Sequence, residues 1–551
     1  MRKRFAIGVL VVVSMLTGCV PGSSERPREG QQGQTAAGEK RVTAVIREAV
    51  ADLRDLAVAE LVTGGLVNFD PPGYPSALLA EAAPSLENGL WKLLPDGRME
   101  TTWRLRGNPR WHDGTPMTAE DLVFTVEVGR DRELPDFGHA GYTLVENVEA
   151  RDERTLVVTW RGPYLEADWM FSVRFGPPLP RHVLESALRA DKAGFVNLRH
   201  WTSDFVGNGP FAVREFIPGS HLQLAAFDGF VPGRPKLDAI EIRFIPDPNT
   251  VIANLLAGSI DVTLGPGLSI DQAVRLQESW RDGTAIHSPH FLTQAAAYPQ
   301  FLTPDPPIVA NVQFRRALAH AIDREVLVQA IQAGVGAPAR AITAPTTAEF
   351  QAIEPSIVDY DYDVRRTIQL VEGLGFTRGP DGAFRDPTNQ ELSVQLWTVA
   401  GNDTYERTTL AVADYWRLAG ITTVPRMVPD SQSRAVMPTA PGFQMAALFT
   451  DLDRRFHSSD AQLPENNFRG RNRGRYMNPE LDALIDRYFT TVPRPERSAI
   501  LADIVRHITD QVVVIHLFYN TVPQMVNRRL KNVSARTPRA EAWNVHLWDI
   551  D

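Results

Sequence analysis

The sequence predicts a mixed α/β fold that is divided into several lobes. The chain has 551 residues, of which 43% are hydrophobic, and this is more than one hydrophobic core accommodates before a chain splits into domains. From about residue 41 onward, strand patterns with a period of two are scattered among helical patterns. Such a mixture along one chain is typical of α/β lobes.

The N-terminus predicts export from the cytoplasm. Three basic residues follow Met1, and residues 5–16 (FAIGVLVVVSML) form an apolar run. A membrane-spanning helix needs about 20 apolar residues, so this run is typical of the apolar region of a signal peptide. Residues 1–18 are therefore predicted to be a signal peptide.

Cys19 is the only cysteine of the chain, and it directly follows the apolar run in the segment LTGC. A single cysteine forms no internal disulfide. The segment resembles the bacterial lipobox, and the resemblance implies that the Cys19 thiol carries a diacylglyceryl group and anchors the protein to the membrane. The alternative is a chance cysteine near an ordinary cleavage site. Residues 19–40 contain no aromatic residue and are predicted to be a flexible tether.

Specific residue patterns place the elements after the tether. The predicted strands cover residues 99–105, 222–227, 240–245, 392–397, 443–449 and 512–518. The predicted helices begin at Thr118, Asp247, Asn311 and Asn478, which are residues of the types that cap helices. We expect the helix from Asp247 to end at Gly258 and the helix from Asn311 to break near Asp323.

Composition and motifs exclude several functions. The formal charge of −9 becomes −12 once Arg2, Lys3 and Arg4 leave with the signal peptide, and nucleic-acid binders carry basic faces instead. The motifs G-x-S-x-G, H-E-x-x-H and the P-loop are missing, and the 12 histidines form no metal-ligand pairs. His112-Asp113 lies in the segment WHDGTP, which is typical of a turn. We therefore expect neither an enzyme nor a cofactor or metal site.

An acidic cluster follows the predicted buried strand at residues 443–449. Asp451 and Asp453 come just after this strand and are followed by Arg454 and Arg455. A carboxylate at the end of a buried strand can face a crevice between lobes. The alternative is a surface loop in which the aspartates and arginines pair with one another.

Five segments together resemble the solute-binding proteins that serve peptide and nickel ABC importers. They occur in that family's order and at its spacing, over a little more than a third of the chain. The segments are LPDG (94–97) with WRLR (103–106) and WHDGTPMTAED (111–121), VGNGPF (206–211), residues 237–262 with PDPNT and GSID, FRRALAHAIDRE (314–325), and NPELDALID (478–486).

The resemblance implies a two-lobed, periplasmic-binding-protein-like clamshell of type II with mixed sheets, an extra subdomain and a discontinuous lobe I. Residues 41–63, 206–304 and 521–551 would form lobe I, residues 64–205 its extra subdomain, and residues 305–520 lobe II. The lobes would close around a ligand by a hinge motion.

The resemblance also implies the ligand-binding residues. In peptide-binding members an aspartate binds the amino terminus of the ligand, and the matching position is Asp451, with Asp453 as the fallback. Phe449 stands where the family has tryptophan, and no proline follows Asp453. Tyr519, just after the predicted final strand, and Trp397 are further candidates, whereas Trp416 lies on a predicted helix and is interpreted as core.

The expected function is capture of a solute, with a peptide as the leading ligand, by a monomer that delivers it to an ABC permease with cytoplasmic ATPases. A sugar, an opine or a metal chelate is the alternative ligand. A sensory lipoprotein of the same fold is the alternative role.

Overall fold

The computed structural model describes residues 38–69, 73–265, 267–347, 349–450, 452–534 and 542–550. The predicted signal peptide, Cys19 and the predicted tether up to residue 37 lie outside the described residues. Lys40, the last residue of that tether, is described, and its Nζ lies 2.6 Å from a carboxylate oxygen of Asp549. Within the described ranges, no helix has the length and apolarity that a membrane crossing requires.

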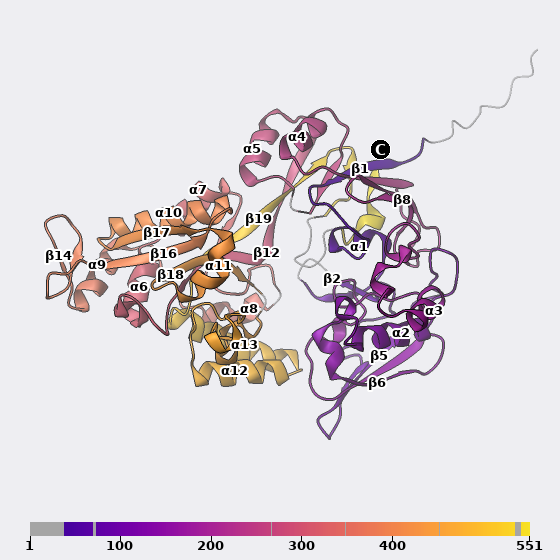
Figure 1. The fold of residues 1–551 in the computed structure, drawn as a ribbon, viewed down its shortest axis with the longest axis horizontal. Helices are drawn as coiled ribbons and strands as arrows, with labels where there is room; N and C mark the ends of the chain where they lie inside the picture. The colour runs from indigo at the N-terminus through magenta and orange to yellow at the C-terminus, as the bar shows by residue number, and fades with distance from the viewer. Residues whose placement is uncertain are drawn as a thin grey trace, which may run out of the picture. The chain divides into compact units, whose positions relative to one another are not determined.

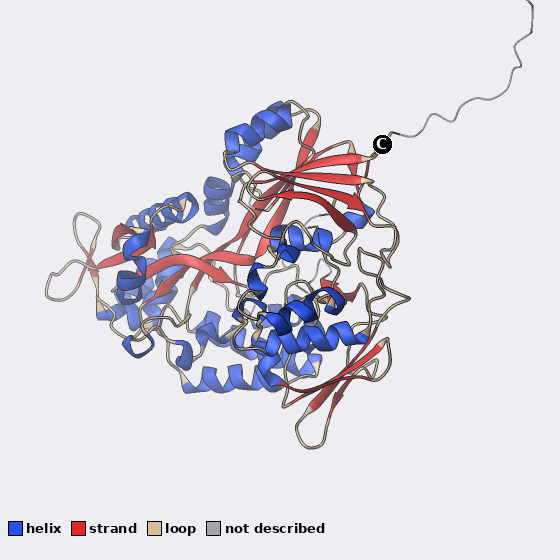
Figure 2. Ribbon diagram, turned by 45° about the vertical axis from the view of Figure 1, so that its right-hand side comes forward, coloured by secondary structure: helices blue, strands red, loops and turns tan. Residues whose placement is uncertain are grey.

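The largest sheet has 11 strands and combines parallel with antiparallel pairs (Figures 1 and 2). Its order is β17-β16-β18-β12-β19-β11-β1-β10-β9-β8, and β13 pairs with β19 outside this path. The strands are β1 (Arg41–Ile46), β8 (Phe211–Ile217), β9 (His221–Ala226), β10 (Ala239–Phe244), β11 (Val262–Leu264), β12 (Gly283–Pro299), β13 (Ala337–Pro338), β16 (Ser393–Val399), β17 (Thr422–Val428), β18 (Phe443–Phe449) and β19 (Ile515–Asn527).

Two long antiparallel strands, β12 and β19, connect the two ends of this sheet. Residues 283–289 of β12 pair with residues 521–527 of β19, on the side where β11 and β1 follow. Residues 294–297 of β12 pair with residues 515–519, on the side where β18 and β16 follow. The register shifts between Pro289 and Gln294, so the ladder is interrupted between the two sides.

A second sheet lies within residues 64–205. It is antiparallel in the order β4-β5-β7-β6, from Trp91–Leu93, Met99–Arg104, Thr155–Trp160 and Val145–Ala150. Trp103, Trp111 and Trp160 are fully buried in the core that this sheet shares with α2 (Ala119–Arg130). Three further pairs are short: β2-β3 (Val67–Phe69, Pro75–Ala77), β14-β15 (Thr377–Arg378, Phe384–Arg385) and β20-β21 (Leu530–Lys531, Asp549–Ile550).

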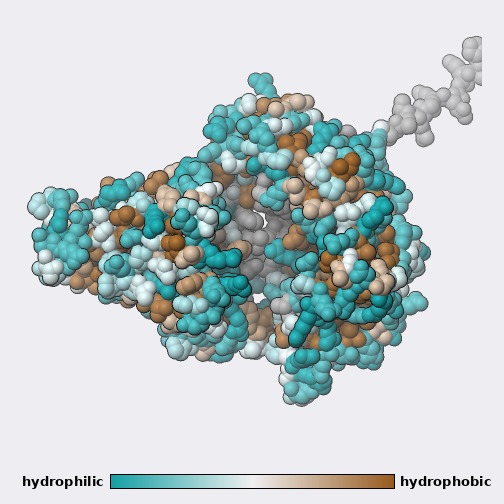
Figure 3. All heavy atoms as spheres, in the orientation of Figure 1, coloured by the Kyte–Doolittle hydropathy of each residue, from teal (hydrophilic) through white to brown (hydrophobic). Residues whose placement is uncertain are grey.

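Helices cover both ends of the large sheet, and separate hydrophobic cores lie beneath them. The remaining helices are α1 (Leu56–Val62), α3 (Arg181–Ala190), α4 (Pro248–Leu256), α5 (Ile270–Ser279), α6 (Val312–His320), α7 (Arg324–Gln332), α8 (Phe350–Ile353), α9 (Val364–Gly373), α10 (Asp403–Leu418), α11 (Asp430–Val436), α12 (Pro479–Thr490) and α13 (Arg494–Asp510). On the face that Figure 3 shows, hydrophobic side chains are distributed among hydrophilic ones, as on ordinary soluble surfaces.

The predicted helix starts are confirmed, and the capping side chains explain them. Asp247, Asn311 and Asn478 each accept hydrogen bonds from backbone N–H groups in the first turns of α4, α6 and α12. The predicted break near Asp323 is also confirmed: α6 ends at His320, and Asp323 caps the next helix, α7. Such caps satisfy donors that a helix start otherwise leaves without partners.

One predicted strand has wrong bounds. The strand predicted at residues 512–518 begins at Ile515 and continues to Asn527. Val512 to Val514 are buried, but they belong to the turn after α13, where Val512 has a positive φ of 43°. The apolar run indicated burial correctly, and burial alone does not distinguish a strand from a buried turn. Trp416 is fully buried in the core against α6, as predicted.

Candidate functional site

A cavity of about 160 Å³ lies beside the end of β18. Asp451 lies outside the described residues, but its neighbours Thr450 and Leu452 both line this cavity. The opposite wall comes from residues 73–75 and 165–169 of the segment predicted as the extra subdomain, and from the start of α13. We call this space the Thr450 cavity. Its lining residues come from three stretches of the chain, 73–169, 343–349 and 450–501, which are separated from one another by more than a hundred residues in sequence.

Asp168 is the buried charge of the Thr450 cavity. Its side chain is 8% exposed, and Oδ1 has no hydrogen-bond partner among the described residues. Arg494 is 3.8 Å from Oδ2, and its guanidinium also lies 4.7 Å from the ring centre of Tyr74. Burial raises the pKa of the Asp168 carboxyl to about 7, because desolvation outweighs the attraction of Arg494 and Arg497. The cavity therefore holds a carboxyl that a cationic group would ionise.

Asp168→Asn is expected to remove a loss of stability between about pH 4 and pH 7. In this window the folded state keeps a proton that the unfolded state has released, so the free energy of unfolding falls as pH rises. For the wild type, a pKa near 7 instead of 3.8 lowers the free energy of unfolding by about 1–4 kcal/mol across this window. The upper limit follows from about 1.36 kcal/mol per pKa unit. Urea unfolding from pH 4 to pH 8 measures this pH dependence, and Glu120→Gln, at an exposed position, is the control. Parallel curves for the wild type and the Asp168 variant would contradict the assignment.

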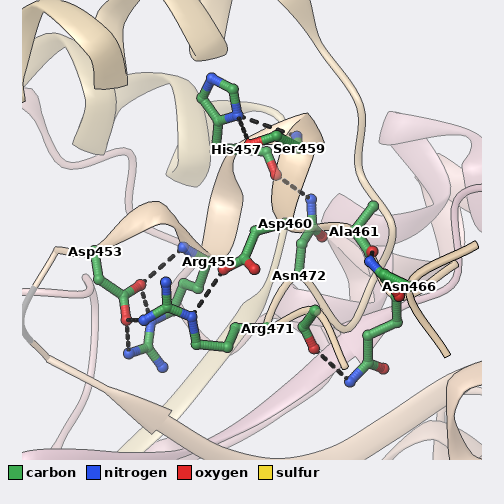
Figure 4. A network of polar contacts seen from close by, with 11 residues as sticks. Asp453, Arg455, His457, Ser459, Asp460, Ala461, Asn466, Arg471 and Asn472 are labelled. Carbon is green, nitrogen blue, oxygen red and sulfur yellow. Dashed lines mark hydrogen bonds and ion pairs between the residues drawn. The ribbon is translucent and has the colours of Figure 1, made fainter. Parts of the chain in front are cut away.

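Asp453 is held in a local ion-pair network (Figure 4). Its carboxylate accepts hydrogen bonds from the backbone N–H, Nε and Nη2 of Arg455, and it lies 3.0 Å from Nη1 of Arg471. Arg471 also contacts Asp460 at 2.8 Å. The local pairing that was the alternative for this cluster is therefore present at Asp453.

Tyr519 lies within β19 and not after its end, so its predicted position relative to the strand is wrong. The side chain is 1% exposed, and its hydroxyl donates to the carbonyl oxygens of Ala341 and Thr343 at 3.2 and 2.8 Å. Nε2 of Gln294 donates to the same Ala341 oxygen at 2.9 Å, and Oε1 of Gln294 accepts from Nδ1 of His516 at 2.8 Å. Because Thr343 lines the Thr450 cavity, Tyr519 supports the backbone behind that wall.

Trp397 is 7% exposed and lies in β16. Its Nε1 donates to Gln395 at 2.7 Å, and the Arg426 guanidinium lies 4.3 Å from its ring centre. It packs with Val428 and Met437 in a small cluster. Met437 lines an open groove of about 700 Å³ that also contains Arg434, Arg469 and Arg473. We call this space the arginine groove. Among the described residues, none of its three arginines forms an ion pair.

His112 and Asp113 form a turn, as predicted. His112 packs against Phe227, and one ring nitrogen lies 3.1 Å from the Gly209 oxygen. Burial lowers the pKa of His112 to about 4, so the ring is neutral at pH 7. Asp113 contacts His182 at 2.7 Å. Neither contact pairs the histidine or the aspartate with a side chain that could serve as a catalytic nucleophile.

Sequence reasoning missed the cavity residues Tyr74, Asp168 and Arg494. A signal for Asp168 was present, because Glu166 and Asp168 interrupt an otherwise aromatic and apolar run at residues 164–171. An acidic residue in such a run is either at the surface or buried beside a partner of opposite charge. Arg494 gave no comparable signal, since it opens an ordinary amphipathic helix.

Comparisons with known proteins agree with this architecture. The sequence profile described as "Bacterial extracellular solute-binding proteins, family 5 Middle" matches residues 81–467, which is more than half of the chain. The oligopeptide-binding protein AppA of Bacillus subtilis is 22% identical over 464 residues, or 82% of this chain and 81% of that protein.

A Brucella ovis protein, named provisionally as an ABC transporter peptide-binding protein, is 25% identical over 345 residues. The match covers 61% of this chain and 59% of that relative, so the chain spans less than two thirds of its length. The crystal structure of the ABC transporter substrate binding protein CtaP from Listeria monocytogenes has a TM-score of 0.73 at 19% identity, with 93% of this chain and 99% of that chain covered. The two-lobed α/β clamshell of periplasmic binding proteins is thus the fold of this chain, and the chain belongs to family 5 of the bacterial extracellular solute-binding proteins.

Proposed function

We propose that this protein captures a peptide outside the cytoplasm and delivers it to a membrane permease that cytoplasmic ATPases drive. The observation that carries the proposal is the family 5 match over residues 81–467. The name of the Bacillus subtilis relative, an oligopeptide-binding protein, supports a peptide as the ligand. The protein acts as a monomer, and neither a cofactor nor nucleic acid takes part.

The amino terminus of the peptide would bind at Asp451. Thr450 and Leu452 on either side of it line the Thr450 cavity, which supports this placement. Asp453 is the weaker candidate because Arg455 and Arg471 already neutralise its carboxylate. Tyr519 would position the cavity wall, and Trp397 would support the strand beside the arginine groove. The three arginines of that groove form no ion pair with the part of the chain that the structure describes, and they suit the carboxylates of a peptide.

The predicted domain boundaries remain part of the proposal. Lobe I would comprise residues 41–63, 206–304 and 521–551, with 64–205 as its extra subdomain, and lobe II residues 305–520. The interrupted ladder between Pro289 and Gln294 supports β12 and β19 as the connection between the lobes. Ligand binding would favour the closed state through its higher affinity for that state.

Native mass spectrometry of the purified protein tests the ligand class, followed by calorimetry with a set of di- to nonapeptides. We expect co-purified peptides and saturable peptide binding. A co-purified sugar, opine or metal chelate, together with no heat of binding for any peptide, would reject the peptide and keep the solute-binding role.

We also propose that Cys19 anchors the mature protein through lipid, on the basis of the LTGC segment that ends the apolar run. One acyl chain binds a membrane only marginally, so several chains on one residue are needed for stable attachment. Cys19→Ala is expected to move the protein from the membrane fraction to the soluble fraction, or to leave it as unprocessed precursor. Mass spectrometry of the wild-type N-terminus checks this, and a mature terminus without lipid on Cys19 would contradict it.

A further inference from the structure

A second cavity, separate from the Thr450 cavity, lies between α1 and the loops of residues 135–142, 173–180 and 200–207. Its volume is about 260 Å³. For comparison, an apolar protein cavity of about 150 Å³ holds one benzene molecule. None of the residues that line it comes from residues 305–520. We call this space the aromatic cavity.

Two groups of aromatic rings line the aromatic cavity. In one group the Trp201 ring contacts Phe137 at 5.1 Å and His200 at 4.7 Å between ring centres, and His200 stacks on Phe205 at 5.2 Å. In the other group Phe175 lies 3.9 Å from His139 and 5.3 Å from Tyr142. Such rings give a large, rigid contact area for a planar molecule.

Polar atoms without partners point to a ligand with hydrogen-bonding groups. Tyr142 is 1% exposed and His200 is 6% exposed, and neither the Tyr142 hydroxyl nor Nδ1 of His200 has a hydrogen-bond partner among the described residues. Both residues line the cavity. Nη1 of Arg54 is a third buried atom of this kind, and it can only donate. Buried polar atoms normally have partners, so several such atoms in one cavity are unusual.

The charges around the cavity cancel. The Arg54 guanidinium makes two hydrogen bonds to the carboxylate of Asp52, at 3.1 and 2.7 Å. Arg174 and Asp136 are the other charged lining residues, and they have opposite signs. Burial lowers the pKa of His200 to about 4 and also lowers the pKa of His139, so both rings are neutral at pH 7. A charged ligand would therefore lose its hydration without meeting a counter-charge.

We infer that the aromatic cavity binds a small uncharged molecule with one aromatic ring and a carbonyl or hydroxyl oxygen. The oxygen accepts from Nη1 of Arg54 or from the Tyr142 hydroxyl, and the ring packs against the aromatic lining residues. This site is additional to the proposed peptide site and does not depend on it.

Calorimetry and saturation-transfer NMR on the full-length protein test the inference with benzamide as the probe. We expect one benzamide per chain. Loss of one neutral hydrogen bond is worth about 0.5–1.5 kcal/mol, so Tyr142→Phe is expected to weaken benzamide binding about two- to tenfold. Tyr164→Phe is the matched control, because Tyr164 belongs to the same aromatic cluster but does not line the cavity.

Further variants and probes make the test decisive. Leu56→Trp adds bulk at a lining residue that is 48% exposed, and this change is expected to abolish benzamide binding without altering the thermal transition. Benzoate is expected to bind more weakly than benzamide. Absence of benzamide binding at millimolar concentration, unchanged binding by the Leu56 variant, or tighter binding of benzoate would each overturn the inference. Competition between benzamide and a bound peptide would overturn the inference that the aromatic cavity is separate from the peptide site.

Discussion

Replacing Asp451 by asparagine is expected to weaken binding of a peptide with a free amino terminus by about 30-fold to several thousand-fold. The α-ammonium group brings a positive charge and up to three donors, and hydrogen bonds between charged groups are stronger than neutral ones. Without the carboxylate, the ammonium group stays buried and unpaired, which costs about 2–5 kcal/mol. At about 1.4 kcal/mol per tenfold change, this cost gives the stated range.

Calorimetry with free and N-acetylated forms of the same peptide measures this effect. Acetylation deletes the ammonium group, so wild-type protein should bind the acetylated peptide as poorly as the Asp451→Asn variant binds the free one. Asp453→Asn is the matched control, because Arg455 and Arg471 already pair with Asp453, and its effect on peptide affinity should be small. If wild type binds both peptides equally, the carboxylate does not recognise an amino terminus.

Much of the fold follows from local signals in the sequence. Caps such as Asp247, Asn311 and Asn478 start helices because their side chains satisfy backbone donors within three residues. The alternation in residues 99–105 and 240–245 predicts strands whose inner faces are buried, and β5 and β10 show that pattern. The full extent of β19 could not be predicted, because beyond residue 518 polar residues such as Asn520 and Gln524 interrupt the apolar run.

The candidate site was less predictable because its residues meet only in three dimensions. The pairing of Asp453 with Arg455 is local, and the sequence kept it open as an alternative. The contact between Asp168 and Arg494 joins residues 326 positions apart (494 − 168), and no local pattern indicates it. The resemblance placed Tyr519 near the ligand, whereas the hydrogen bonds of its hydroxyl to residues 341 and 343 depend on the packing of a distant loop.

Asp261 shows how a motif of the family acts in the structure. The Asp261 side chain is 1% exposed and accepts hydrogen bonds from Nε and Nη2 of Arg529 at 2.6 and 2.7 Å. The backbone N–H of Thr43 in β1 donates to the same carboxylate at 2.9 Å. The backbone of Asp261 also bonds to Thr43 and to Asn527, the last residue of β19. Through its carboxylate and its backbone, Asp261 therefore connects the start of β11 with β1, the end of β19 and Arg529 just beyond it.

Asp261→Ala is expected to lower the free energy of unfolding by about 2–4 kcal/mol. The change removes the hydrogen bonds between a buried carboxylate and the half-exposed Arg529, and it leaves the Thr43 N–H without its acceptor. Urea unfolding followed by circular dichroism measures the change. Glu146→Ala is the matched control: Glu146 also pairs with one arginine, Arg98, but both side chains are 42% exposed, and such surface pairs contribute about 0–1 kcal/mol. Equal shifts for the two variants would mean that Asp261 does not hold the three strands together. A large decrease in the free energy of unfolding for Asp261→Ala alone would explain why the chain has an aspartate at the end of its GSID segment. The carboxylate there bonds to Thr43 of β1 and to Arg529 just after β19.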